Sequence, residues 1–323
     1  MKKKIDRRTV ETVGGQAVIE GVMLRDKMHY AVAVRREKGD IVTKKEAIVS
    51  AASKYTLFKL PFLRGMLNFF EQLKLGYSIL TYSADEAMTE EERKKEAAKK
   101  KKGNGDWVLT IALILSLVFA IALFKALPFV LTVLLGGLFN SKNMAVDHPI
   151  VFNSIAGVIK LLVFFFYLLA MSLMKDMRRM FQYHGAEHKV ANAYEAGEKI
   201  SPKTVKRFPV VHPRCGTTFI FLVLAVGVVV YIAMQPLINS LPGFRTMGKF
   251  QSNIAILAIQ IGMLPFIAGI SYELLKLAFR FEKNFVLQAA IFPGLLFQRL
   301  TTKEPDQKQI EVAIASFEKL KGA

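Results

Sequence analysis

The chain has 323 residues, of which 52% are hydrophobic and 25 are phenylalanine, yet its formal net charge is +19. A soluble domain does not combine these properties, so the apolar and basic residues must be separated along the chain. Long uncharged stretches do alternate with segments rich in lysine and arginine, which predicts a multi-spanning, mainly α-helical membrane protein. The single cysteine excludes an internal disulfide framework and fits a thiol kept reduced in the cytoplasm. The basic segments flank the apolar ones, so we expect contact with anionic membrane lipids and no nucleic-acid partner.

Residues 1–57 predict a cytoplasmic N-terminal region. The first 13 residues are rich in charged side chains and no apolar core follows them, so no secretory signal peptide is expected. Two β-rich runs, 30–34 and 41–43, flank a four-residue turn at 37–40, which predicts a β-hairpin and a small α+β region.

Residues 58–106 predict an amphipathic helix at the membrane interface, followed by a basic linker. The apolar residues of 57–82 recur near helical spacing, but charges interrupt them too often for a span. The dense charge run of 85–106 is typical of a solvated helix end and linker.

Residues 107–278 predict a four-helix transmembrane domain, with a long motif loop at 175–217. The first apolar stretch is interrupted at Pro128, so it forms either one long kinked helix or a span with a re-entrant piece. The predicted spans are 107–124, continued by 129–139, then 150–174, 218–241 and 254–277.

The distribution of lysine and arginine predicts the orientation. Residues 1–106 contain 23, residues 175–217 contain 9 and the tail from 276 contains 8, whereas the two remaining loops contain 3. The positive-inside rule therefore predicts that both termini and the motif loop lie on the cytoplasmic side of the bacterial inner membrane. The C-terminal tail, 279–323, carries an amphipathic helix from Gln307 that Pro305 and Asp306 introduce.

The motif loop contains the pattern H-x-x-E-H, formed by His184, Glu187 and His188. Two histidines four residues apart lie on one face of a helix, and this pattern is the inverted form of a zinc motif whose glutamate acts on a water. Gly185, within the same turn, costs about 1 kcal/mol of helix propensity relative to alanine. Its presence indicates that another segment approaches the helix backbone there.

A second run, His212-Pro213-Arg214-Cys215, supplies a histidine and the only cysteine three residues apart. Imidazole and thiolate together favour zinc, or another divalent transition metal, over magnesium or calcium. His184, His188, His212 and Cys215 are therefore the predicted metal ligands. Glu195, seven residues after His188 on the same helical face, is an additional or supporting candidate.

Two interpretations of this constellation remain open. The histidines could lie at the membrane interface, where they bind lipid headgroups or cap helices without any metal. If a metal is bound, four ligands make a closed structural site, whereas three ligands with an open position make a catalytic one in which Glu187 is the general base. Glu187 could equally pair with Arg178, Arg179 or Lys189.

Other polar residues also require a reason. Glu273, near the cytoplasmic end of the fourth span, either pairs with Lys276 or supports the motif loop as a further carboxylate. Lys160, inside the second span, is expected to face the bundle and pair with a carboxylate such as Glu273, or to extend towards the interface. Glu20 and Arg214 are further supporting candidates, although a charged residue on a small strand, such as Glu20, is usually exposed.

With these motifs, the chain resembles the DUF1385 family, the YqhQ-like bacterial membrane proteins that are described as predicted metal-dependent enzymes. The resemblance covers nearly the whole chain and implies the same fold and the same important residues, without a substrate. The segments that carry it are 14–25, 183–189, 212–217, 271–273 and the tail 300–313.

The sequence therefore favours a metal-dependent, hydrolytic enzyme that acts on a lipid-linked or other membrane substrate at the cytoplasmic face. An alternative is a non-enzymatic scaffold or assembly factor with a structural zinc site, which binds protein partners through its cytoplasmic regions. A third hypothesis is a transporter with Lys160 and Glu273 along its path, but the chain has no evident internal repeat.

Overall fold

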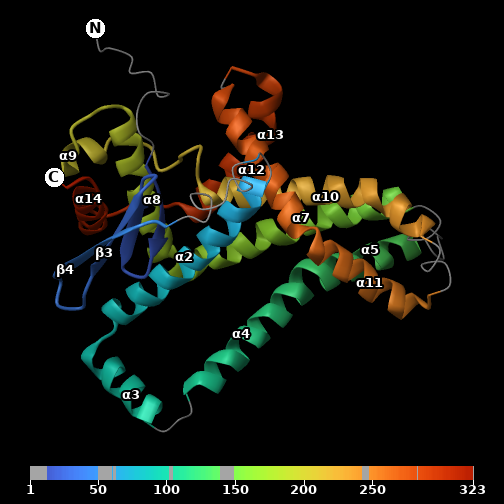
Figure 1. The fold of residues 1–323 in the computed structure, drawn as a ribbon, viewed down its shortest axis with the longest axis horizontal. Helices are drawn as coiled ribbons and strands as arrows, with labels where there is room; N and C mark the ends of the chain where they lie inside the picture. Colours follow the sequence, from blue (N-terminus) through green and yellow to red (C-terminus); the bar gives the residue numbers. More distant parts are fainter. Residues whose placement is uncertain are drawn as a thin grey trace.

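The computed structural model describes residues 13–49, 60, 63–101, 105–138, 149–241, 247–281 and 283–322. Figure 1 shows a sheet with α8 (Lys175–Glu195), α9 (Pro202–Val205) and α14 (Gln307–Lys321) beside it at one end of the molecule, and further helices extending away from them. We call the first part the sheet lobe; it comprises β1 to β4, α8, α9 and α14.

Four antiparallel strands form the sheet in chain order, each paired with the next. The predicted hairpin is confirmed, and its turn contains Gly39 at a φ of 92°, a conformation that glycine adopts without strain. The strands are β1 (Gly14–Val18), β2 (Gly21–Arg25), β3 (His29–Arg35) and β4 (Ile41–Ala47).

Both faces of this sheet are covered, so neighbouring residues of one strand enter different cores. Leu24 and Ala31 pack with α8 and α14, whereas Met23 and Val32 pack with Ile79 of α2 (Leu63–Ala87). The continuous apolar run of β3 follows from this double burial. The predicted C-terminal helix is α14, which starts at an Asp306 capping box.

The remaining helices include the segments of membrane length. Within the described residues, three helices are long and apolar enough to span a membrane, at Ile114–Gly136, Ile150–Leu173 and Gly216–Ile238. The fourth predicted span is broken: α11 and α12 meet at a bend of 41° and reach spanning length only as a pair. The helices are α3 (Glu90–Lys101), α4 (Gly105–Ile121), η2 (Ala122–Ala126), α5 (Leu127–Leu138), α7 (Pro149–Leu173), α10 (Gly216–Ser240), α11 (Lys249–Gly262), α12 (Leu264–Arg280) and α13 (Phe285–Thr301).

The first span is one helix, the first of the two arrangements that the sequence left open. A π-helical turn, η2, joins α4 to α5 directly before Pro128. Proline has no N–H to donate, and its ring would collide with the carbonyl four residues earlier. The wider π-turn accommodates both effects, so the helix continues instead of turning back.

Candidate metal centre

Helix α8 is buried on most sides because it lies between the sheet, α14 and the segment 206–212. His184, Glu187 and His188 lie on this helix within one turn, as the H-x-x-E-H spacing predicts. Two neighbouring side chains hold the facing segment: Lys189 donates to the carbonyls of Lys206 and Phe208, and Asn192 to those of Pro209 and Val211. Sequence reasoning did not identify these contacts.

The predicted close approach at Gly185 is confirmed. A Cβ at this position would lie 2.0 Å from the carbonyl oxygen of Lys303. The segment after α13 is held there because the Lys303 N–H donates to the Phe181 carbonyl at 2.9 Å. Gly185 therefore lets the 301–303 segment lie directly against α8, next to His184.

Three of the four predicted ligands come together. One donor atom from each of His184, His188 and Cys215 lies within 4.8 Å of the others. Nε2 of His184 is 3.2 Å from Sγ of Cys215. Cys215 is the N-cap of α10, and its sulfur accepts the Thr217 N–H at 3.3 Å. A helix start thus fixes the sulfur opposite the two imidazoles.

The outer nitrogen of each imidazole is fixed by a backbone carbonyl. His184 Nδ1 lies 2.9 Å from the Thr301 oxygen, and His188 Nδ1 lies 2.5 Å from the Val210 oxygen. A carbonyl only accepts, so each Nδ1 carries the proton and each neutral ring presents a lone pair at Nε2. Burial lowers the pKa of His188, which favours this neutral form. Metal-binding histidines are commonly oriented in this way.

Glu187 lies beside both imidazoles and is almost fully buried. One of its carboxylate oxygens is 3.7 Å from Nε2 of His184 and 3.7 Å from Nε2 of His188. Within the described part of the chain, no lysine or arginine forms an ion pair with it: Arg179 pairs with Glu20, and Lys189 pairs with Glu304. Burial raises the pKa of Glu187. On the β1 side, Gly15 leaves the space that this side chain occupies.

His212 is not part of this group of donor atoms. Its Nε2 lies 3.3 Å from a carboxylate oxygen of Glu195, and Arg214 binds the other oxygen of that carboxylate. Burial alone would raise the pKa of Glu195, but His212 and Arg214 outweigh it and hold that pKa below its ordinary value. Glu195 and Arg214 therefore support the turn that carries Cys215, instead of facing the three donors.

Gln298 of α13 holds the same turn, and sequence reasoning did not identify it. Its side chain accepts the His212 N–H at 3.0 Å and donates to the His212 carbonyl at 2.9 Å. It also donates to the Thr218 hydroxyl at 2.6 Å. The signal available in the sequence was a glutamine within a mainly apolar stretch, and the structure shows that it is fully buried.

Two further predicted residues lie outside the donor group. Glu20 is in the β1–β2 turn at a φ of 51°, where it binds Arg179 and accepts the Tyr183 hydroxyl at 3.1 Å. Glu273 forms an ion pair with Arg64 of α2 at 2.6 Å. The expected pairing of Glu273 with Lys276 or Lys160 is therefore replaced by one that joins α2 to α12.

These features define a mainly helical protein with helices of membrane length, a small antiparallel sheet and a buried His–His–Cys group. The chain belongs to the DUF1385 family of proteins of unknown function, whose model matches residues 60–323. It is 33% identical over 313 residues to the uncharacterized protein YqhQ of Bacillus subtilis (strain 168), covering 95% of this chain and 91% of that protein. No solved structure matches it. The resemblance predicted from the motifs is confirmed at the level of the family.

Proposed function

We propose that this chain is a metal-dependent membrane enzyme that binds zinc, or another divalent transition metal, through His184, His188 and Cys215. In this proposal Glu187 is the general base of a hydrolytic reaction. The reaction takes place at the cytoplasmic face of the bacterial inner membrane, as the lysine and arginine distribution predicts.

The arrangement of acceptors carries the metal assignment. Two imidazole lone pairs, a sulfur and a buried carboxylate face one another, and the described side chains offer at most a thiol or carboxyl proton among them. Buried acceptors without donors are unfavourable unless a proton or cation joins them. Nitrogen and sulfur ligands are those that zinc prefers, and thiolate and carboxylate charges would balance a divalent cation.

The number of ligands favours an active site over a structural one. Structural zinc sites are closed by four protein ligands, whereas catalytic sites keep an open position. Because the His212 ring is held by Glu195, three donors remain beside Glu187. A metal in such a site acts as a Lewis acid and lowers the pKa of a bound water. In this proposal Glu187 would accept a proton from the attacking water.

The position of the site suggests the class of substrate. Cys215 directly precedes α10, one of the three helices of membrane length. A site at the first residue of such a helix lies near the membrane surface. We therefore propose a lipid-linked or other membrane substrate.

The decisive experiment measures metal and hydrolysis in the same preparations. The full chain would be purified in detergent, loaded with zinc and tested against lipid-linked phosphoesters and membrane peptides. We expect one zinc per chain in the wild type and in Glu187→Gln, with hydrolysis in the wild type alone. Unchanged hydrolysis in Glu187→Gln would refute the general base. A wild type that binds no zinc would refute the metal site altogether. Stoichiometric zinc without hydrolysis would favour the structural site of a scaffold protein.

A further inference from the structure

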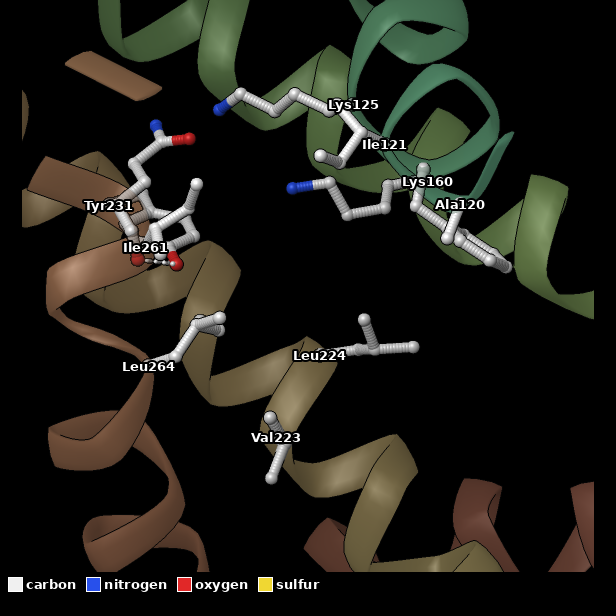
Figure 2. Close-up of a pocket in the computed structure, with 12 residues that line it drawn as sticks. Ala120, Ile121, Lys125, Lys160, Val223, Leu224, Tyr231, Ile261 and Leu264 are labelled. Carbon is white, nitrogen blue, oxygen red and sulfur yellow. Dashed lines mark hydrogen bonds between the residues drawn. The ribbon is translucent and has the colours of Figure 1, made fainter. Parts of the chain in front are cut away.

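A second polar group lies among the helices of membrane length. Lys125 is near the middle of the candidate span Ile114–Gly136, and Lys160 is near the middle of Ile150–Leu173. Their ammonium nitrogens lie 5.9 and 5.6 Å from the centre of the same ring, that of Tyr231 on α10. Figure 2 shows both lysine side chains pointing into one cavity between these helices.

Among the residues that the structure describes, no aspartate or glutamate lines either of the two adjoining cavities that these lysines share. Glu273, the carboxylate expected near Lys160, is bound to Arg64 instead. Two cationic side chains at the depth of a bilayer centre are unfavourable, and such residues generally mark the site of an ion or substrate. The contact with the Tyr231 ring compensates in part but supplies no negative charge. The counter-charge is therefore expected from a ligand.

The shape of the cavities specifies what kind of ligand fits. A larger cavity of about 280 Å³ and a smaller one of about 60 Å³ share four lining residues, among them both lysines and Tyr231. The polar groups are thus gathered where the cavities meet, and the remainder of the larger cavity is apolar. Its apolar lining includes Phe124, Val223, Leu224, Ile261 and Leu264.

The larger cavity is open towards the outside of the helices. Three of its lining side chains, Ile121, Ile261 and Leu264, keep 37%, 50% and 43% of their surface exposed. Ile261 and Leu264 flank the bend between α11 and α12. If these helices span the bilayer, this opening faces lipid, so an amphiphile can enter sideways.

We propose that this cavity binds a single-chain amphiphile with an anionic head group, either a carboxylate or a phosphate. The head group lies between Lys125 and Lys160, and the chain occupies the apolar cavity. One ligand then pairs with the charge of both lysines and packs against the apolar lining. This inference goes beyond the metal-dependent reaction and does not depend on it.

The first test uses the wild-type chain in detergent with fluorescent probes. One probe is a single-chain fatty acid, the second is a lysophosphatidic acid, and the comparator is the methyl ester of the same fatty acid. We expect saturable binding of one anionic probe per chain, about tenfold tighter than the ester, because charge-assisted contacts are lost in the ester. The tighter of the two anionic probes identifies the head group. Failure of both anionic probes to bind more tightly than the ester would overturn the proposal.

The second test changes the lysines while preserving side-chain length. Lys125→Met and Lys160→Met should each weaken binding of the anionic probe about tenfold, and Lys→Arg at either position should largely preserve it. Lys175→Met, an exposed position at the start of α8, removes the same charge outside the cavity and is the matched control. Met variants that bind like the wild type would refute the proposal. If they do not fold, the comparison of the two anionic probes with the ester decides the question on the wild type.

Discussion

At the scale of single residues, the site depends on which nitrogen each histidine presents. The Nδ1–H groups of His184 and His188 donate hydrogen bonds to backbone carbonyls. Both Nε2 atoms are therefore left to face Cys215. His212 has a different environment, since its Nε2 is hydrogen-bonded to the Glu195 carboxylate. The two H-x-x-E-H histidines and the H-x-x-C cysteine thus form the donor group, and the histidine of the second run stabilises a turn.

This difference predicts opposite results for two substitutions in one turn. Cys215→Ser should lose stoichiometric zinc, because it replaces a thiolate ligand by a hydroxyl group that binds zinc poorly. His212→Asn should retain one zinc per chain, because His212 only holds the turn. Metal analysis of purified variants, loaded in excess zinc, measures both. Loss of zinc in His212→Asn, in a protein that remains folded, would restore the closed four-ligand site.

Among the described glycines, Gly185 leaves the least space for an added Cβ. Gly185→Ala would place a methyl group against the Lys303 carbonyl, and a rigid backbone atom cannot move aside as a side chain can. We expect a loss of about 3 kcal/mol in stability, at the upper end for overpacking. Thermal unfolding of the purified variant measures this loss. Gly14→Ala is the control because no atom lies within 4 Å of its added carbon. Equal midpoints for the two variants would contradict this packing.

At the scale of elements, the turn of residues 212–215 joins α8 to α10 through the Glu195 carboxylate. Glu195 is buried, and His212 and Arg214 hold its pKa below its ordinary value. A carboxyl group whose pKa is lowered by folding stabilises the folded state above its unfolded pKa. This contribution is lost as the pH falls through the lowered value.

We therefore expect the unfolding temperature to fall steeply with acidification below about pH 4.3, where the unfolded state begins to bind the proton. Glu195→Gln should be less stable at neutral pH and should show a shallower decline. Both proteins are measured with a chelator present, so that metal release does not contribute. Parallel pH profiles for the two proteins would show that Glu195 does not stabilise the turn.

At the scale of the whole molecule, the sheet lobe restricts how often the chain crosses a membrane. The sheet near the N-terminus packs against α14 near the C-terminus, and α8 packs against both. These three elements must lie on the same side, so the number of crossings between any two of them is even. In Figure 1, α5 and α11 lie far from the lobe, to which α7 returns the chain. If α10 crosses and the bent pair α11–α12 crosses as one span, an even number is kept, and the described part of the chain contains four spans.

This topology predicts the labelling of single cysteines. In a Cys215→Ser background, a cysteine at Lys38 in the β3–β4 turn and one at Lys319 in α14 should behave alike. A membrane-impermeant maleimide should label both in inverted vesicles and neither in intact cells with a permeabilised outer layer, because the positive-inside rule predicts a cytoplasmic position for the basic lobe. Labelling of the two positions from opposite sides would refute an even number of crossings. Labelling of both from outside would reverse the orientation.

The sequence by itself determined the class of fold, three of the membrane-length helices, the β3–β4 hairpin and the start of α14. Each of these rests on local hydropathy, turn chemistry or capping, which act between residues close in the chain. The H-x-x-E-H spacing likewise fixed His184, Glu187 and His188 on one helical turn, and Gly185 indicated a close backbone approach that the structure confirms.

Only the tertiary structure decided which partners these residues meet. The carbonyls of Thr301 and Val210 hold the rings of His184 and His188, and the Gln298 side chain holds the backbone of His212. Arg64, more than two hundred residues away, took the Glu273 carboxylate, and Lys125 joined Lys160 in one cavity. The physical reason is that hydrogen bonds and charges act over a few ångströms in space, and distance along the chain does not reveal that proximity.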